Sequence, residues 1–194
     1  MIKICVIGAI GSGKSFVARK FGFPVFNADL EVANLYLKNK SCFIKLKKKL
    51  PKYFNNFPVN KNSIIEAILA NNLNLKKIIK IIHPEIKKKT NIFINRNKNK
   101  KIVVLDIPLL LENKINKKKD IIVFVDANKV EIIKRLKKRE NFNKNLLKKF
   151  KKIQLPLQYK KKKSNFILKN DFTKLSVKKG VMQILKKILK NIKK

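Results

Sequence analysis

The sequence has few of the residues that break, bend or cross-link a chain. Among 194 residues there are 5 glycines, 6 prolines, 2 cysteines and no tryptophan. The shortage of glycine and proline argues against a disordered or low-complexity chain. Cys5 and Cys42 are too few for a disulfide framework, and they lie in no CxxC or Cys/His spacing that would indicate structural zinc. We therefore expect a globular chain without cross-links.

Long apolar runs and a targeting segment are also missing. No run approaches the roughly 20 apolar residues of a membrane span, and the first residues lack the basic start, apolar stretch and cleavage site of a signal peptide. We therefore expect a cytoplasmic protein without membrane contact. With 45% hydrophobic residues, the chain can bury one α/β core with small additions.

Acidic residues are far fewer than basic ones. The sequence has 11 Asp and Glu residues and 50 Lys and Arg residues, which gives a formal net charge of +39. Nucleic-acid binding is one interpretation, because a basic surface releases counterions from phosphate backbones. However, nearly all the basic residues are lysines spread along the chain, and Lys, Asn and Ile share A/T-rich codons. A specific binder would use more arginine forks and aromatic platforms. Compositional bias is the more economical explanation, so no nucleic-acid partner is expected, although the positive field would attract an anionic substrate.

Short apolar runs alternate with longer amphipathic stretches, which predicts βα units around a five-stranded parallel sheet. The expected strands are Ile2–Ile7, Pro24–Phe26, Ile102–Ile107, Ile121–Val125 and Phe166–Leu168. The third and fourth are nearly all aliphatic, as in strands covered on both faces. Helical periodicity covers Lys14–Phe21, Ala28–Leu37, Phe43–Leu50, Ser63–Leu69, Leu75–Ile82, Glu85–Asn95, Lys129–Glu140, Lys144–Ile153 and Lys174–Ile192.

Two stretches do not fit a simple alternation of strands and helices. About 75 mostly helical residues separate the second and third strands, far more than an ordinary crossover, which indicates a helical insertion over residues 30–99. Residues 140–163 are dense in lysine and contain Pro156, and we expect them to form a mobile cover, or lid. Residues 1–29, 100–139 and 164–194 then form the core of a single domain.

One motif, directly after the first expected strand, indicates phosphate binding, and its context matters more than the match itself. Residues Gly8-Ala9-Ile10-Gly11-Ser12-Gly13-Lys14-Ser15 match G-x-x-x-x-G-K-[ST], after an apolar strand and before a helix. The glycines let successive N–H groups converge on one anion. Lys14 is expected to reach the β- and γ-phosphates of ATP, Ser15 to bind Mg²⁺, and the Phe16 N–H to face the α-phosphate. A glycine turn without a ligand is the alternative, and the full spacing disfavours it. The motif predicts a P-loop NTPase fold, a three-layer α/β/α sandwich.

Two carboxylates follow expected strands. Ligands of open α/β sheets gather beyond the carboxyl ends of the strands, so Asp29 could orient an acceptor hydroxyl and take its proton. An Asp at a strand-to-helix turn is also a common helix N-cap. Asp106 ends the third strand, where it could help to hold Mg²⁺ or could cap the turn before Pro108. Both alternatives stay open at these two positions.

Several further motifs follow the phosphate loop in a fixed order. They are Asn27-Ala28-Asp29, His83-Pro84, Ile107-Pro108-Leu109-Leu110-Leu111-Glu112, Arg135 to Arg139, and Gln154, Lys160 and Asn170. Their order and spacing resemble those of dephospho-CoA kinases over essentially the whole chain. The phosphate loop is shared with many families, but Pro-Leu-Leu-x-Glu together with an Asp-Ala-Asp element is much narrower.

This resemblance implies transfer of the ATP γ-phosphoryl group to the 3′-hydroxyl of dephospho-CoA, the last step of coenzyme A synthesis. It implies a helical CoA-binding region at residues 30–99 and a lid at 140–163. The resemblance implies that the catalytic residues are Asp29, Lys14 and Arg139. It also implies that Ser15 binds Mg²⁺, with Asp106 as a further candidate ligand. Contacts with the small-molecule substrate are implied for Asn27, Asp29, His83, Pro108, Leu109 and Glu112. No obligate protein partner is implied.

The chain departs from the family pattern at two positions. Asn27 replaces the first Asp of the Asp-Ala-Asp element, which removes one negative charge and cannot act as a base. Lys61 stands where the family often has an arginine, and a lysine cannot bind phosphate with two parallel hydrogen bonds.

Arg135 and Arg139 are rare arginines in a lysine-rich chain and lie four residues apart, on one face of an expected helix. They support the resemblance, although they could be ordinary surface residues. His83, the only histidine, has a structural interpretation as well, because Pro84 suits the first turn of a helix. A nucleoside or nucleotide kinase of similar architecture is the alternative function. A nucleic-acid-stimulated ATPase is a third and weaker one.

Overall fold

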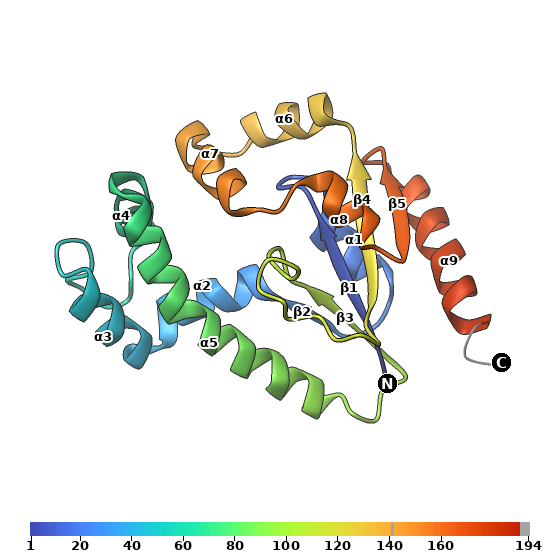
Figure 1. Ribbon diagram of the computed structural model, residues 1–194, viewed down its shortest axis with the longest axis horizontal. Helices are drawn as coiled ribbons and strands as arrows, with labels where there is room; N and C mark the ends of the chain where they lie inside the picture. The colour runs from blue at the N-terminus through green and yellow to red at the C-terminus, as the bar shows by residue number, and fades with distance from the viewer. Residues whose placement is uncertain (141, 191–194) are drawn as a thin grey trace. The chain divides into compact units, whose positions relative to one another are not determined.

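The structure is a computed structural model that describes residues 1–140 and 142–190. The chain divides into two compact units (Figure 1). The sheet unit contains Met1–Asn27, Asn97–Phe142 and the chain from Gln154 onward, and the helical unit contains Ala28–Arg96 and Asn143–Ile153. Residue 141, in the expected lid, and residues 191–194, at the end of the expected core, lie outside the described residues.

The sheet unit is built on five parallel strands, so the predicted fold class is confirmed. They are β1 (Ile2–Gly8), β2 (Val25–Asn27), β3 (Ile102–Asp106), β4 (Ile121–Ala127) and β5 (Phe166–Asn170), in the order β2-β3-β1-β4-β5. The central strand β1 pairs with β3 and β4, so that Ile4 lies between Val104 and Ile121. All five carboxyl ends therefore meet at one edge of the sheet.

Both faces of the central strands are buried, as their aliphatic composition predicts. One set of alternate residues, including Ile4 and Val6 of β1, packs against the helices α1 (Lys14–Lys20) and α9 (Lys174–Lys190). The other set, which includes Cys5 and Ile7, is equally buried. A short helix, α8 (Leu157–Lys162), contacts β1. Side chains on both faces of β1 are therefore part of the core.

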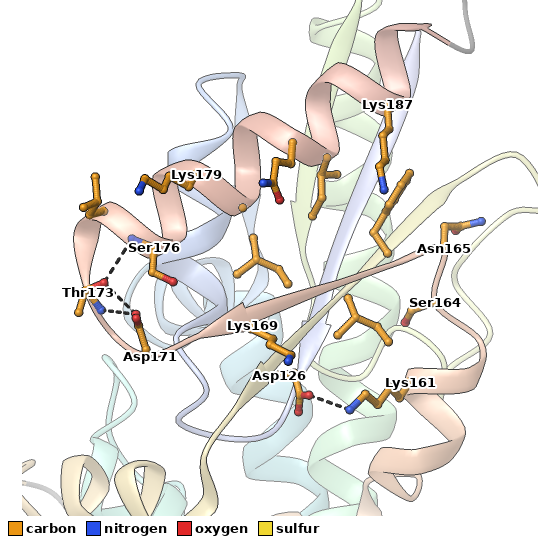
Figure 2. Close-up of a pocket in the computed structure, with 17 residues that line it drawn as sticks. Asp126, Lys161, Ser164, Asn165, Lys169, Asp171, Thr173, Ser176, Lys179 and Lys187 are labelled. Carbon is orange, nitrogen blue, oxygen red and sulfur yellow. Dashed lines mark hydrogen bonds and ion pairs between the residues drawn. The ribbon is translucent and has the colours of Figure 1, made fainter.

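Strand β5 lies at the edge of the sheet and borders an open groove along α9 (Figure 2). Ile167 on this strand is 47% exposed. Charged side chains border the groove, among them Lys169 and the ion pair between Lys161 Nζ and Asp126 Oδ2, at 2.7 Å. Of these residues only Lys169 lies on the edge strand itself, where a charged side chain hinders pairing with another chain.

The helical unit consists of α2 (Ala28–Lys38), α3 (Lys40–Lys49), α4 (Lys61–Ala70), α5 (Asn72–Arg96) and α7 (Lys144–Ile153). Helix α5 contacts α2, α3 and α4, and α7 contacts α4. Two ion pairs join α5 to its neighbours, Glu85 with Lys45 at 3.1 Å and Lys89 with Glu31 at 2.8 Å. Half of the stretch that we expect to be a lid, Asn143–Ile153, thus groups with the helical unit, and the chain from Gln154 groups with the sheet unit.

Helix α5 corrects the prediction of two helices separated at His83-Pro84. It runs without a break from Asn72 to Arg96, with Pro84 inside it. Proline removes one hydrogen bond to the preceding turn, but Ile82 and Ile86 on either side are both buried. Their packing continues the helical spacing across the proline and outweighs the lost bond.

The end of α6 and the presence of α8 also differ from the prediction. Helix α6 (Lys129–Lys137) begins with the Asn128 side chain accepting the Val130 N–H at 2.8 Å, but it ends before Glu140 because no apolar residue follows Leu136 within the next turn. Helix α8 was not predicted, because its six residues show no apolar period. Among the described residues, none of the helices combines the length and the apolar character needed to cross a membrane.

Candidate active site

The phosphate loop joins the end of β1 to the start of α1. Its main chain turns tightly, with Ser12 N donating to Ala9 O at 3.2 Å. The Lys14 side chain reaches back across the loop and donates from Nζ to the same Ala9 carbonyl at 2.8 Å. Gly13 caps α1 in the left-handed conformation without a side-chain cap. The first N–H groups of the helix therefore face the loop and can bind an anion.

Glycine is required in this loop because neighbouring atoms leave no room for a side chain. A Cβ at Gly8 would lie 2.7 Å from the Val125 carbonyl oxygen. A Cβ at Gly13, where φ is 86°, would lie 2.5 Å from Asn170 Nδ2. The side chain of Ser12 is buried in the same loop, and its Oγ has no hydrogen-bond partner in the described part of the chain. A close-packed loop of main-chain amides, with the Ser12 hydroxyl as a further hydrogen-bonding group, is suited to bind a triphosphate.

Asn170 at the end of β5 supports the loop from the side. Its Nδ2 donates to the Ser12 carbonyl at 2.8 Å, and its Oδ1 accepts the Phe172 N–H at 2.9 Å. The Arg135 guanidinium lies over the Phe172 ring, 4.5 Å from its centre. The sequence placed Asn170 in the family pattern but gave no signal for this contact, because 158 residues separate Asn170 from Ser12. Only the parallel sheet brings them together.

The structure brings Asn27 and Asp106 into contact at the carboxyl ends of neighbouring strands. They are register partners in β2 and β3. Asn27 Nδ2 donates to Asp106 Oδ2 at 2.9 Å, and Asp106 is 2% exposed. The Asn27 amide thus fills a position where an aspartate would set two carboxylates side by side. Asn27 is a donor to a neighbouring carboxylate here, and its predicted contact with substrate stays a prediction.

Asp29 lies in the first turn of α2, after Ala28, and is exposed. It is inside the helix, so the N-cap interpretation of this residue is wrong. The partial positive charge at a helix start favours the ionised carboxylate in this turn. Its proposed role in catalysis stays a prediction.

The loop after β3 contains Pro108, Leu109 and Glu112. Pro108 and Leu109 are half-buried. Glu112 Oε1 accepts the Leu155 N–H at 3.0 Å and pairs with Lys160 Nζ at 2.5 Å. This carboxylate is therefore engaged within the protein, and its predicted contact with substrate is not tested by the structure. Lys160, which the sequence placed in the family pattern, is the partner that holds it.

The two arginines do not share a helical face as predicted. Arg135 lies on α6, whereas Arg139 lies two residues beyond its last residue, in a turn where the Phe142 N–H bonds to the Arg139 carbonyl at 2.9 Å. Both side chains are exposed. The catalytic role of Arg139 stays a prediction.

His83 belongs to the helical unit, half-buried on α5. Desolvation lowers the pKa of His83 below its ordinary value of 6.5, so the imidazole is neutral near pH 7. Desolvation also raises the pKa of Cys42 to about 11 and that of Cys5 further. Neither thiol is poised to act as a nucleophile.

The described residues contain no cluster of three or more His, Cys, Asp or Glu side chains that could hold a metal by itself. Ser15, at the start of α1, and the buried Asp106, at the end of β3, are the predicted oxygen ligands. Such a sparse set fits Mg²⁺ that arrives with a nucleotide, because this ion usually keeps several waters and is bound by phosphates with one or two protein oxygens.

Comparison with known proteins gives one consistent result. The family model described as dephospho-CoA kinase matches residues 2–175. A dephospho-CoA kinase of Wolbachia pipientis wMel is 35% identical over 187 residues, which cover 94% of this chain and 95% of that protein. A dephospho-CoA kinase of Bartonella henselae is 35% identical over 196 residues, 97% of this chain and 98% of that protein.

Solved structures agree on the fold. A crystal structure from Thermus thermophilus is similar with a TM-score of 0.76 and 25% identity, covering 98% of this chain and 97% of that one. The dephospho-CoA kinase of Campylobacter jejuni has a TM-score of 0.59 at 20% identity, with 96% of each chain covered, and supports the fold alone. The family model spans both units and all five strands. The chain therefore belongs to the dephospho-CoA kinase family.

Proposed function

We propose that this chain transfers the γ-phosphoryl group of ATP to the 3′-hydroxyl of dephospho-CoA, giving coenzyme A and ADP. The observation that supports ATP as the phosphoryl donor is the loop between Gly8 and Ser15. Hydrogen bonds from the Lys14 and Asn170 side chains to main-chain carbonyls stabilise this loop. The choice of dephospho-CoA as the phosphoryl acceptor rests on the family match over residues 2–175. The proposed location is the cytoplasm, where ATP is maintained.

Donor binding uses the loop amides and Lys14. The amides and the Lys14 ammonium bind the β- and γ-phosphate oxygens, which spreads negative charge over several fixed donors. Bound Mg²⁺ supplies further neutralisation of these oxygens, with Ser15 and Asp106 as the protein residues that would hold it. Arg139 stabilises the charge on the transferring group.

Acceptor activation is assigned to Asp29. Its carboxylate accepts the proton of the ribose 3′-hydroxyl while the oxygen bonds to the γ-phosphorus. The bond from that phosphorus to the β–γ bridging oxygen breaks, and ADP leaves with the bridging electrons. The proton passes from Asp29 to water. Positioning supplies most of the rate, because effective molarities of aligned groups are large.

An assay of ADP release with a panel of acceptors tests the function. The panel contains dephospho-CoA, nucleosides, nucleoside monophosphates and single-stranded RNA, with water as the baseline. We expect acceptor-dependent ADP release with dephospho-CoA and a product phosphorylated on the 3′-oxygen. Preference for a nucleoside or a nucleotide would establish the alternative kinase, and stimulation by RNA alone would establish an ATPase of another class.

The role of Asp29 is tested by Asp29→Asn beside Glu31→Gln. Both remove one carboxylate from the first turn of α2, and the Glu31 carboxylate pairs with Lys89 of α5, outside the proposed chemistry. We expect Asp29→Asn to lower kcat by about 10²–10⁴ with ATP affinity unchanged, and Glu31→Gln to stay within about threefold. Similar turnover in the two variants would remove Asp29 from the mechanism.

A further inference from the structure

The groove along β5 and α9 lies entirely within the sheet unit, and the proposed chemistry does not use it. Its volume is about 1000 Å³, and residues 164–169 line it without a gap. Successive side chains of a strand point to opposite faces, so an unbroken run of lining residues means that the groove follows the main chain of β5. The groove is therefore the open edge of the sheet rather than a cavity beneath one face.

Strand β5 has unpaired main-chain groups along this edge. It is the last strand of the sheet, and within the described residues it pairs with β4 alone. The N–H and C=O groups of a strand point alternately to its two sides, so half of those in β5 face the groove. Proteins often protect such edges with very short strands or with proline, and the opposite edge strand, β2, has only three residues. Strand β5 has five residues and no proline, so it can accept a further strand.

Lysines border this edge (Figure 2). Lys179 and Lys187 come from α9 on one side of β5, and Lys169 lies on the strand itself. Among the described residues, none of these three lysines takes part in an ion pair. Their charges are therefore available to an anionic occupant of the groove.

The acidic side chains that line the groove are already engaged. Asp126 pairs with Lys161 at 2.7 Å. Asp171 accepts both the Thr173 N–H and the Thr173 hydroxyl, each at 2.9 Å, in the turn before α9. An occupant along the edge therefore meets an excess of positive charge, and an acidic occupant complements it.

Three kinds of occupant differ in how well they fit these features. A second copy of this chain would bring its own net charge of +39 and set lysine near lysine, which is destabilising. A nucleic acid would neutralise the lysines, but its phosphate oxygens cannot donate hydrogen bonds to the free carbonyl groups of β5. An acidic, extended polypeptide meets both requirements, because its main chain supplies donors and acceptors and its side chains supply carboxylates.

We propose that the groove along β5 is a docking site for an acidic, extended segment of another protein, which adds a strand to the open edge of the sheet. Main-chain hydrogen bonds to β5 provide affinity, and Asp or Glu side chains of the segment pair with Lys179, Lys187 and Lys169. Ile167, which is 47% exposed, gives the added strand an apolar contact. This inference is independent of the proposed function, because the groove residues take no part in it.

The test uses the full chain and a fluorescent peptide in which Glu and Val alternate, so that its carboxylates share one face of an extended strand. Two comparison peptides have the same length. One is the same sequence methylated on its main-chain nitrogens, which keeps the charges but removes the donors, and in the other Lys replaces Glu. Fluorescence anisotropy at about 0.15 M salt measures the Kd, and hydrogen exchange followed by NMR reports on the amides of β5.

A pair of double variants locates the binding site. Lys179→Glu with Lys187→Glu reverses two charges that line the groove. Lys178→Glu with Lys186→Glu is the matched control, because these two lysines have the same spacing on the same helix, are exposed and lie outside the groove. Both variants have the same net charge, so a general attraction to the basic chain affects them equally.

We expect wild type to bind the Glu-Val peptide at least about tenfold more tightly than either comparison peptide. The bound peptide should slow exchange at alternate amides of β5. The groove variant should lose about 5- to 50-fold in affinity for the Glu-Val peptide and gain affinity for the Lys-Val peptide, which also shows that it is folded. The control variant should stay within about twofold of wild type.

Several results would overturn the inference. One is equal binding of the methylated and unmethylated peptides, and another is an equal loss of affinity in the groove and control variants, because net charge alone then attracts the peptide. Polyuridylate or phosphatidylserine vesicles that bind through the groove lysines, without binding of the Glu-Val peptide, would assign the groove to a nucleic acid or a lipid surface. If the groove variant does not fold, glutamine replaces glutamate in both double variants, and the same comparison decides.

Discussion

At the scale of single residues, Gly13 is the position of the phosphate loop that leaves the least space for a side chain. Gly13→Ala places a Cβ 2.5 Å from Asn170 Nδ2 at a φ of 86°. We expect this substitution to displace Asn170, to open the loop and to abolish ATP binding. Isothermal titration calorimetry with ATP measures the affinity. Gly22→Ala is the control, because Gly22 has a φ of 76° with no atom within 4 Å of its Cβ. It should cost only about 1–2 kcal/mol of backbone strain and leave ATP binding intact. Equal ATP affinity in both variants would contradict the packing argument.

Asn27 is a residue where reversion to the family pattern should be harmful to stability. Asn27→Asp exchanges a donor for a second carboxylate beside Asp106, whose Oδ2 lies 2.9 Å from the Asn27 amide. Like charges raise the pKa of one partner, so the penalty is full well above the ordinary Asp pKa and vanishes where both groups are protonated. We expect a loss of about 1–3 kcal/mol at pH 8 and a smaller loss near pH 4, measured by urea unfolding. A loss independent of pH would refute the explanation, and Asn165→Asp, away from Asp106, is the control.

At the scale of elements, α5 contains a proline that its packing overrides. Pro84 is exposed inside a helix of 25 residues, and its removal restores a backbone hydrogen bond. We expect Pro84→Ala to raise the free energy of unfolding by about 1–3 kcal/mol, measured by chemical denaturation. Pro156→Ala, outside any helix, should change it by much less.

The same variant separates a structural role of the His83-Pro84 pair from a functional one. Higher stability with unchanged KM for dephospho-CoA would make the pair structural. A KM for dephospho-CoA that rises while the protein becomes more stable would show that the local shape of α5 at the proline serves the acceptor.

At the scale of the whole molecule, the net charge of +39 acts on both stability and association. Self-repulsion destabilises the folded state, and salt screens it over a Debye length of about 10 Å at 0.1 M. We expect the Tm to rise by several degrees between 50 and 500 mM NaCl while kcat/KM for the anionic substrates falls. A calorimetric and kinetic salt series measures both. A Tm that falls with salt would mean that attractive pairs outweigh the repulsion.

The strands and the phosphate loop were predictable because their signal is local. Apolar runs such as residues 102–107 bury both faces wherever they pair, and the spacing from Gly8 to Ser15 sets its own turn. Helix ends were less predictable, because they depend on what the next turn can pack against. The end of α6 after Leu136 and the continuity of α5 through Pro84 are both decided by such packing.

The sequence by itself determined the parallel α/β core, the phosphate loop and the family, because hydrophobic period and motif spacing are properties of adjacent residues. Only the tertiary structure decided that Asn27 binds Asp106, that Asn170 supports the Ser12 carbonyl, and that Glu112 holds Leu155 and Lys160. These contacts join residues 43 to 158 positions apart. Their geometry follows from strand order and register, which no local pattern encodes.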